Sequence, residues 1–124
     1  MAVTKISRVI GVDDMQRAVT FYSNALGLSV EPGSNGHWTD LTCGNGYLSL
    51  QAYRPPEPEI VPTMVIMTVD NLDSTIAAVE AAGGTLHERH DNPHAPVVIG
   101  HVIDTEGNVV QLAQPRQRTP HADG

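Results

Sequence analysis

The sequence predicts an α+β protein made of two β-α-β-β-β modules, and three observations support this. Each half contains one amphipathic helix pattern that ends at a glycine. Short apolar runs separated by turn residues follow each helix pattern, as β-strands do. Sliding the first half onto the second aligns Val12–Met15 with Val69–Leu72, and Gly27 with Gly84. A matching order of elements in both halves indicates an internal duplication.

Module one is expected over residues 3–53. The run ISRVIGV predicts its first strand. A helix is predicted from Asp14 to Leu26, because Asp14 is a favourable N-cap and apolar residues recur at helical spacing up to Gly27. Three short strand patterns follow the helix, LSVEPG, HWTDLTCG and GYLSLQAY, with turns that contain glycine between them.

Module two is expected over residues 63–114, after a linker at residues 54–62. The linker sequence RPPEPEIVP contains four prolines and no periodic apolar face. Module two then begins with the strand pattern TMVIMTV and continues with a helix that starts near Leu72 and stops at Gly83–Gly84. Residues 1–114 are therefore expected to form a single domain, and the polar residues 115–124 a flexible tail.

The last part of module two, GHVIDTEGNVVQLAQ, predicts a β-hairpin. Its turn, Asp104–Asn108, contains Gly107, which can adopt the positive φ that such a corner needs. Side chains alternate along a strand, so His101 shares a face with the apolar residues of the incoming arm, and Gln111 does so on the outgoing arm. If that face lines a pocket, these two residues are its polar groups.

Composition limits the kinds of partner. The 14 acidic and 7 basic residues give a formal net charge of −7, which argues against nucleic-acid binding and favours tolerance of a cationic ligand. Aromatic residues make up only 4% of the chain, so a pocket would be lined by aliphatic side chains. Cys43 has no partner for an internal disulfide, and no apolar run is long enough for a signal peptide or membrane span. We expect a cytoplasmic protein that binds no membrane.

Two motifs resemble the vicinal oxygen chelate superfamily, which includes glyoxalase I, bleomycin-resistance proteins, fosfomycin-resistance enzymes and extradiol dioxygenases. VDDMQRAVTFYSNALGL is similar to the first helix of that superfamily, and IDTEGNVVQL to its late hairpin, usually written D-P-(D/E)-G-N-x-x-E-L. The resemblance covers residues 3–114. It implies the glyoxalase/bleomycin-resistance fold, in which curved sheets form a cup around a small-molecule ligand. Members of this length often form homodimers in which each cup draws on two chains.

The resemblance also implies where a metal ion would bind, and the residues at those positions do not suit one. Metal-dependent members carry ligands early in the first strand of each module, in the last strand of module one, and in the strand after the late hairpin. The corresponding residues here are Ser7, Met64, Leu50 and Gln111. Divalent metals prefer imidazole, carboxylate or thiolate ligands. We therefore expect no metal and no other cofactor, which disfavours ordinary glyoxalase I or dioxygenase chemistry.

His101 is the strongest candidate for a role at the site. An imidazole can exchange a proton near neutral pH, so His101 could be a catalytic acid or base, or could hydrogen-bond a ligand. Alternatively, it is a structural histidine bonded to a backbone carbonyl. Trp38 and Asp40 share one face of a strand, so Trp38 could stack on a planar ligand while Asp40 pairs with a cation. Alternatively, Trp38 anchors the core or a dimer interface.

The segment HERHDNPH contains three histidines beside acidic residues, which invites interpretation as a metal site. His87 and His90 are three residues apart, however, and this spacing in a strand places side chains on opposite faces. We expect instead a polar rim that controls entry to the cup.

Together these features favour a metal-independent small-molecule-binding protein of the glyoxalase/bleomycin-resistance type. It would sequester or carry an apolar, optionally cationic, metabolite or antibiotic. The expected ligand-binding residues are Ser7, Trp38, Asp40, Leu50, Met64, His101 and Gln111. Two alternatives remain open. One is an enzyme of the superfamily, a lyase, isomerase or dioxygenase relative that uses His101 as acid or base, or a displaced metal site. The other is a scaffold whose purpose is the dimer itself.

Overall fold

The computed structural model describes residues 6–44, 46–53 and 61–116, and this part of the chain contains two modules with the same order of elements. Module one consists of β1 (Arg8–Gly11), α1 (Met15–Leu26), β2 (Ser29–Val30), β3 (Trp38–Cys43) and β4 (Gly46–Gln51). Module two consists of β5 (Val61–Thr68), α2 (Leu72–Ala81), β6 (Thr85–His90), β7 (Val97–Ile103) and β8 (Asn108–Pro115). The predicted α+β fold with a repeated β-α-β-β-β order is confirmed.

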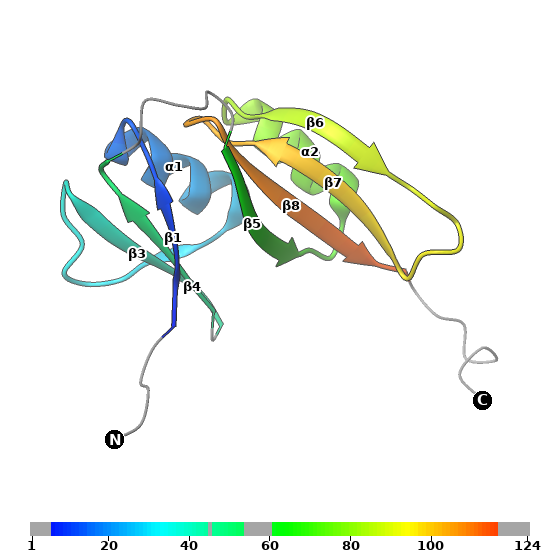
Figure 1. Ribbon diagram of the computed structural model, residues 1–124, viewed down its shortest axis with the longest axis horizontal. Coiled ribbons are helices and arrows are strands. Elements are labelled where there is room, and N and C mark those ends of the chain that lie inside the picture. Colours follow the sequence, from blue (N-terminus) through cyan, green and yellow to red (C-terminus); the bar gives the residue numbers. More distant parts are fainter. Residues whose placement is uncertain (1–5, 45, 54–60, 117–124) are drawn as a thin grey trace, which may run out of the picture.

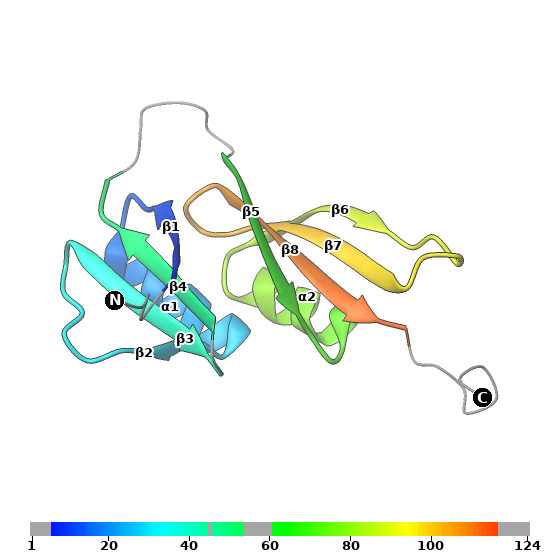
Figure 2. The same cartoon turned by 60° about the horizontal axis from the view of Figure 1, so that its bottom comes forward.

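Each module forms its own four-stranded sheet, in the orders β1-β4-β3-β2 and β5-β8-β7-β6. The sheets are curved and lie side by side without closing into a barrel, with β1 and β5 as the neighbouring edge strands (Figure 1). Both helices cover the same side of this arrangement, and the turned view shows the same layering (Figure 2). We call the face of each sheet that points away from its helix the open face.

Both helices begin and end where the sequence predicts. The side chain of Asp14 accepts a hydrogen bond from the Arg17 amide at the start of α1, and Gly27 ends that helix with a φ of 70°. Asn71 caps α2 in the same way through the Ser74 amide. The apolar residues at helical spacing are buried against the sheets.

The ends of module two differ from the predicted boundaries. β5 begins at Val61, so the last two residues of the predicted linker belong to a strand. Pro62 is tolerated there because β5 is an edge strand. Arg116 lies in the predicted tail, but its backbone amide bonds the Pro96 carbonyl and its guanidinium bonds the Ala95 carbonyl. The remaining residues of the predicted linker and tail, 54–60 and 117–124, lie outside the described residues.

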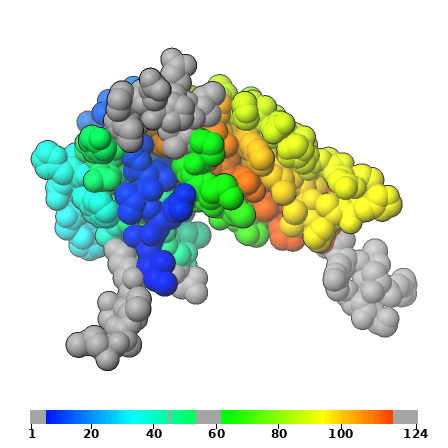
Figure 3. All heavy atoms as spheres, viewed as in Figure 1, coloured from blue at the N-terminus to red at the C-terminus, as the bar shows by residue number. Residues whose placement is uncertain are grey.

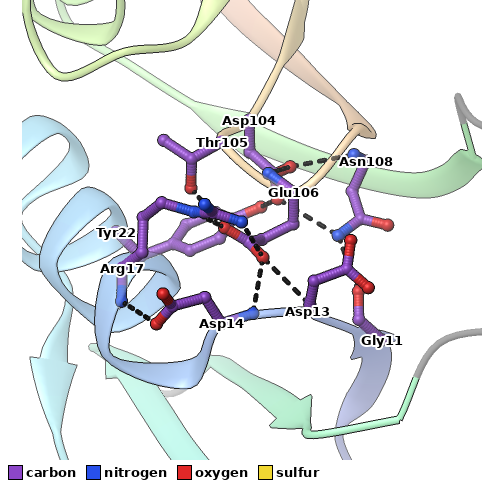
Figure 4. A network of polar contacts seen from close by, with 9 residues as sticks. All are labelled: Gly11, Asp13, Asp14, Arg17, Tyr22, Asp104, Thr105, Glu106 and Asn108. Atoms are coloured by element: carbon purple, nitrogen blue, oxygen red, sulfur yellow. Dashed lines mark hydrogen bonds and ion pairs between the residues drawn. The ribbon is translucent and has the colours of Figure 1, made fainter.

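The turn between β7 and β8 joins the two modules, because it carries a buried carboxylate to the start of α1 (Figure 4). Glu106 accepts hydrogen bonds from the backbone amides of Asp13 and Asp14, each at 2.9 Å. It also accepts two from the Arg17 guanidinium, at 2.6 Å and 3.0 Å. A residue of module two therefore satisfies the free amides and the positive end of the module-one helix.

A second carboxylate, that of Asp104, organises the turn itself. It accepts hydrogen bonds from the Tyr22 hydroxyl and from the backbone amides of Glu106 and Asn108. The Asn108 side chain then donates to the Gly11 carbonyl at 2.9 Å, which ties the turn to β1. Tyr22, Asp104 and Asn108 are all buried. Burial raises the pKa of the Tyr22 hydroxyl well above its usual value, so Tyr22 remains a donor to Asp104.

We predict that Glu106→Gln destabilises the protein. The glutamine amide has one acceptor oxygen where the carboxylate has two, and it leaves the Arg17 guanidinium without its anion. The free energy of unfolding should therefore fall by about 2–3 kcal/mol. Urea denaturation followed by circular dichroism measures this change. Asp73→Asn is the matched control, because Asp73 is exposed and its ion pair with Arg89 should contribute no more than about 0.5 kcal/mol. Equal losses in the two variants would contradict the assignment.

The contribution of Glu106 to stability should also depend on pH. Burial acts to raise the pKa of Glu106, but hydrogen bonds from Arg17, Asp14, Thr105 and Asp13 outweigh it, and the pKa is lowered below 4.5. A lowered native pKa means that the contribution is present above pH 4.5 and is lost as the pH falls through the native value. The difference in unfolding free energy between the wild type and Glu106→Gln should shrink accordingly in acid. A difference that grows in acid would have the wrong sign.

Candidate functional site

The open faces expose large apolar side chains, three of them near the seam between the two sheets. The exposed fractions there are 43% for Val9 on β1, and 74% for Met64 and 62% for Ile66 on β5. Trp38 on β3, two strands farther from the seam, is 39% exposed. β1 and β5 meet along the middle of the molecule on this side (Figure 3). Met64 lies at a β-bulge with a φ of 63°, which removes it from the regular alternation of the strand. These side chains form an apolar surface that single-chain packing leaves uncovered.

Three of the predicted residues gather on the open face of module one. Trp38 donates from Nε1 to Asp40 Oδ1 at 2.9 Å, and the Ser49 hydroxyl donates to the same oxygen at 2.6 Å. The Ser7 hydroxyl lies 3.0 Å from the Ser49 hydroxyl, which completes a polar row across β3, β4 and β1. The predicted shared face of Trp38 and Asp40 is confirmed. Ser49 was not expected at the site, although it alternates with Leu48 and Leu50 in the pattern GYLSLQ.

Leu50 does not face this surface, contrary to the expectation. Its side chain is fully buried in the core beneath α1, and the side chain of Leu48 on the same face of β4 is buried as well. The reason is the alternation of β4: the residues on its open face are Ser49 and Gln51, one position on either side of Leu50. The expected position of Leu50 on the cup face is therefore not observed.

His101 and Gln111 are cross-strand partners on the open face of module two. Their neighbours Gly100 and Leu112 are buried on the opposite face. A Cβ at Gly100 would lie 3.3 Å from Leu72 and Ile76 of α2, which shows how closely the helix packs there. The predicted faces of this hairpin are confirmed, and so is the positive φ of Gly107, which is 83°.

The histidine-rich strand β6 adds two potential metal ligands to this face, although its sequence was interpreted as part of a polar rim. Glu88 pairs with His101, and His90 pairs with Ile99, because the register shifts between Leu86 and Glu88. Glu88 and His90 therefore share the open face with His101. Glu88 Oε2 lies 3.3 Å from His90 Nε2 and 3.7 Å from His101 Nδ1. The expectation of a polar rim instead of a metal site rested on the spacing of three between His87 and His90, and a bulge at His87 was not visible in the sequence.

The four positions that hold a metal in the metal-dependent relatives do not fit one here. The Ser7 hydroxyl is engaged with Ser49, and Leu50 is in the core. Met64 offers a thioether and Gln111 a neutral amide, neither of which is a strong ligand for zinc, iron or manganese. No catalytic step can be assigned to a metal at these positions.

A cavity of about 510 Å³ lies between the modules, but it is not the predicted site. Its walls come from the end of α1, from β3 and β4, and from β5. Ser7, Trp38, His101 and Gln111 do not line it. The predicted residues therefore occupy two open surfaces, one in each module, and not an enclosed pocket of a single chain.

Comparison with known proteins identifies the class to which this fold belongs. A profile of the Glyoxalase/Bleomycin resistance protein/Dioxygenase superfamily matches residues 5–113. The chain belongs to this superfamily. Among curated proteins, none matches the sequence. Of the helices in the described ranges, none combines the length and apolar character of a membrane span.

Solved structures with the same fold are distant in sequence. A family enzyme from Burkholderia phytofirmans PsJN superposes with a TM-score of 0.74 at 15% identity, covering 89% of this chain and 97% of that one. A lactoylglutathione lyase from Agrobacterium tumefaciens gives 0.69 at 18% identity, with coverages of 92% and 95%. The bleomycin resistance determinant of transposon Tn5 gives 0.68 at 15% identity, with coverages of 93% and 100%. These likenesses show the fold alone.

Proposed function

We propose that this protein binds a small, largely apolar molecule on its open faces, without a metal at the four family positions, and thereby sequesters or carries it. The observation that carries the proposal is the exposure of Val9, Met64 and Ile66 at the seam. Grouped apolar side chains on a surface mark binding sites, whereas scattered ones do not. His101 and Gln111 provide the few polar groups that orient a ligand in such a site.

The charge of the protein favours a ligand that carries a positive group. The formal net charge is −7, and Asp40 lies on the open face beside Trp38, the single tryptophan. An indole face and a carboxylate together suit a cation attached to a planar or apolar body. The likeness of the fold to a bleomycin resistance determinant makes an antibiotic one class of ligand to test, beside cationic metabolites. We place the protein in the cytoplasm, where Cys43, exposed and free, stays reduced.

A homodimer would complete this site. The two open surfaces lie on separate sheets, and the apolar residues at the seam between them are exposed in a single chain. A second copy placed against them would bury these residues and enclose a ligand between modules of two chains. Such an arrangement explains why apolar residues at the seam are exposed in a single chain.

The second candidate function is an enzyme in which His101 moves a proton. The observation in its favour is Glu88, whose carboxylate lies 3.7 Å from His101 Nδ1 and could orient the imidazole. A carboxylate beside a histidine is the usual arrangement for a general base. In this case His101→Ala would abolish turnover while affinity for the substrate is retained.

We predict that a ligand of the stated class raises the melting temperature of the protein. His101→Ala should weaken the affinity for that ligand by about tenfold, because one hydrogen bond is lost. The measurement is a thermal-shift screen of the chelator-treated full chain with bleomycin, other cationic natural products, and short acyl or aromatic metabolites. His87→Ala is the control, because His87 is exposed at the bulge of β6. If no compound shifts the melting temperature, or if both variants behave alike, the proposed site is wrong.

We predict further that the protein is dimeric and that Ile66→Asp weakens the dimer at least about tenfold, or 1.4 kcal/mol, by burying a charge in the interface. Sedimentation equilibrium measures the association. Val30→Asp is the control, because Val30 is also apolar and exposed, at 45%, but lies on β2, the edge strand farthest from the seam. A monomeric wild-type chain, or a stronger effect of Val30→Asp, would argue against closure of the site by a second copy.

A further inference from the structure

Three potential metal ligands meet on the open face of module two. They are the carboxylate of Glu88 and the imidazoles of His90 and His101, which come from the neighbouring strands β6 and β7. One ligand atom from each residue lies within 4.8 Å of the other two. The two imidazole rings are 5.3 Å apart between centroids and are inclined at 67°. No other group of three such residues occurs in the described ranges.

The spacing of these atoms fits a tetrahedral ion. With zinc–ligand bonds of about 2.0–2.1 Å, two ligand atoms of a tetrahedron lie about 3.3–3.4 Å apart. Glu88 Oε2 lies 3.3 Å from His90 Nε2 and 3.7 Å from His101 Nδ1. Small side-chain rotations would therefore bring all three atoms to bonding distance. Two nitrogen donors and one oxygen favour zinc and its neighbours over magnesium or calcium, which prefer oxygen alone.

We propose that Glu88, His90 and His101 bind a divalent transition metal ion of the zinc class. The site differs from the four family positions, which lie just before β1 and on β4, β5 and β8, whereas these ligands lie on β6 and β7. It shares His101 with the proposed small-molecule site, but that function requires no metal. Three protein ligands leave the fourth position of the tetrahedron open to water or to a ligand atom.

The strand geometry explains why these side chains converge. Leu86 pairs with Val102 on the helix side of the sheet, and regular alternation would place His87 opposite His101. The bulge at His87 instead places Glu88 opposite His101. Arg89 consequently faces α2, where it bonds Asp73 at 2.7 Å. The open face thus gains a carboxylate and an imidazole two residues apart, beside the imidazole of β7.

The exposure of the three side chains makes them accessible to an ion from solvent. The exposed fractions of the side chains are 55% for Glu88, 53% for His90 and 23% for His101. A site of this kind needs no unfolding to load, and its variants should fold normally because no core residue is altered. Binding can therefore be measured on the folded full-length chain.

The test is calorimetric titration of zinc into the full-length chain after chelator treatment and dialysis. We expect one zinc ion per chain. The affinity for zinc should fall at least about tenfold in His90→Ala, His101→Ala and Glu88→Gln, because loss of a metal ligand should weaken binding no less than loss of a residue that hydrogen-bonds a ligand. His87→Ala and His94→Ala are matched controls, since both histidines lie in the same segment outside the cluster. Both should retain wild-type affinity.

Cobalt provides a second readout of geometry. Substituted cobalt should give the intense visible absorption of a four-coordinate ion, and His101→Ala should reduce it. The proposal is overturned if the three variants bind zinc as the wild type does, if binding is lost instead in His87→Ala or His94→Ala, or if no ion binds. Ligand-induced thermal shifts of the chelator-treated protein separately report on the small-molecule function, so failure of one proposal does not imply failure of the other.

Discussion

The structure depends on one buried charge, that of Glu106 at the start of α1. Its carboxylate accepts hydrogen bonds from two backbone amides of module one and from the Arg17 guanidinium. If module two moved away, the carboxylate would lose its donors and the amides of Asp13 and Asp14 would lose their acceptor, which are both unfavourable. The two sheets are therefore held with their helices on one side. Because of this constraint, both open faces point to the same side, where one ligand or one second chain can contact both.

The polar residues divide into two groups with different surroundings. Asp104, Glu106 and Asn108 are buried, and their oxygen and nitrogen atoms are bonded within the protein. His101 and Gln111 lie on the open face and are partly exposed. The hairpin motif IDTEGN, one of the two motifs that resemble the superfamily, thus contributes buried side chains that link the modules. The candidate site residues His101 and Gln111 lie on either side of this motif in the sequence.

The sequence predicted features that depend on local spacing. The helix cap at Asp14, the start of the second helix near Leu72, the positive φ of Gly107 and the alternating faces of the last hairpin all follow from nearby residues. It could not predict features that depend on register between strands. The orientation of Leu50 changes with a shift of one residue, and the convergence of Glu88 with His101 depends on a bulge at His87. The contacts of Glu106 could not be read locally either, because the partners are far apart in the sequence.

In the described ranges, the register between paired strands shifts at two places, and both lie in module two. One shift is in β5 at Met64 and the other is in β6 near His87. Each bulge changes which side chains reach the open face. The residues that follow the bulge on the other face of the strand still point toward the helix. As a result, β5 carries an exposed methionine at its bulge, whereas β6 presents a carboxylate and an imidazole beside His101. Both register shifts leave the order of the strands and the buried core intact. Local register, which the core tolerates, therefore decides which side chains these strands present on their open face.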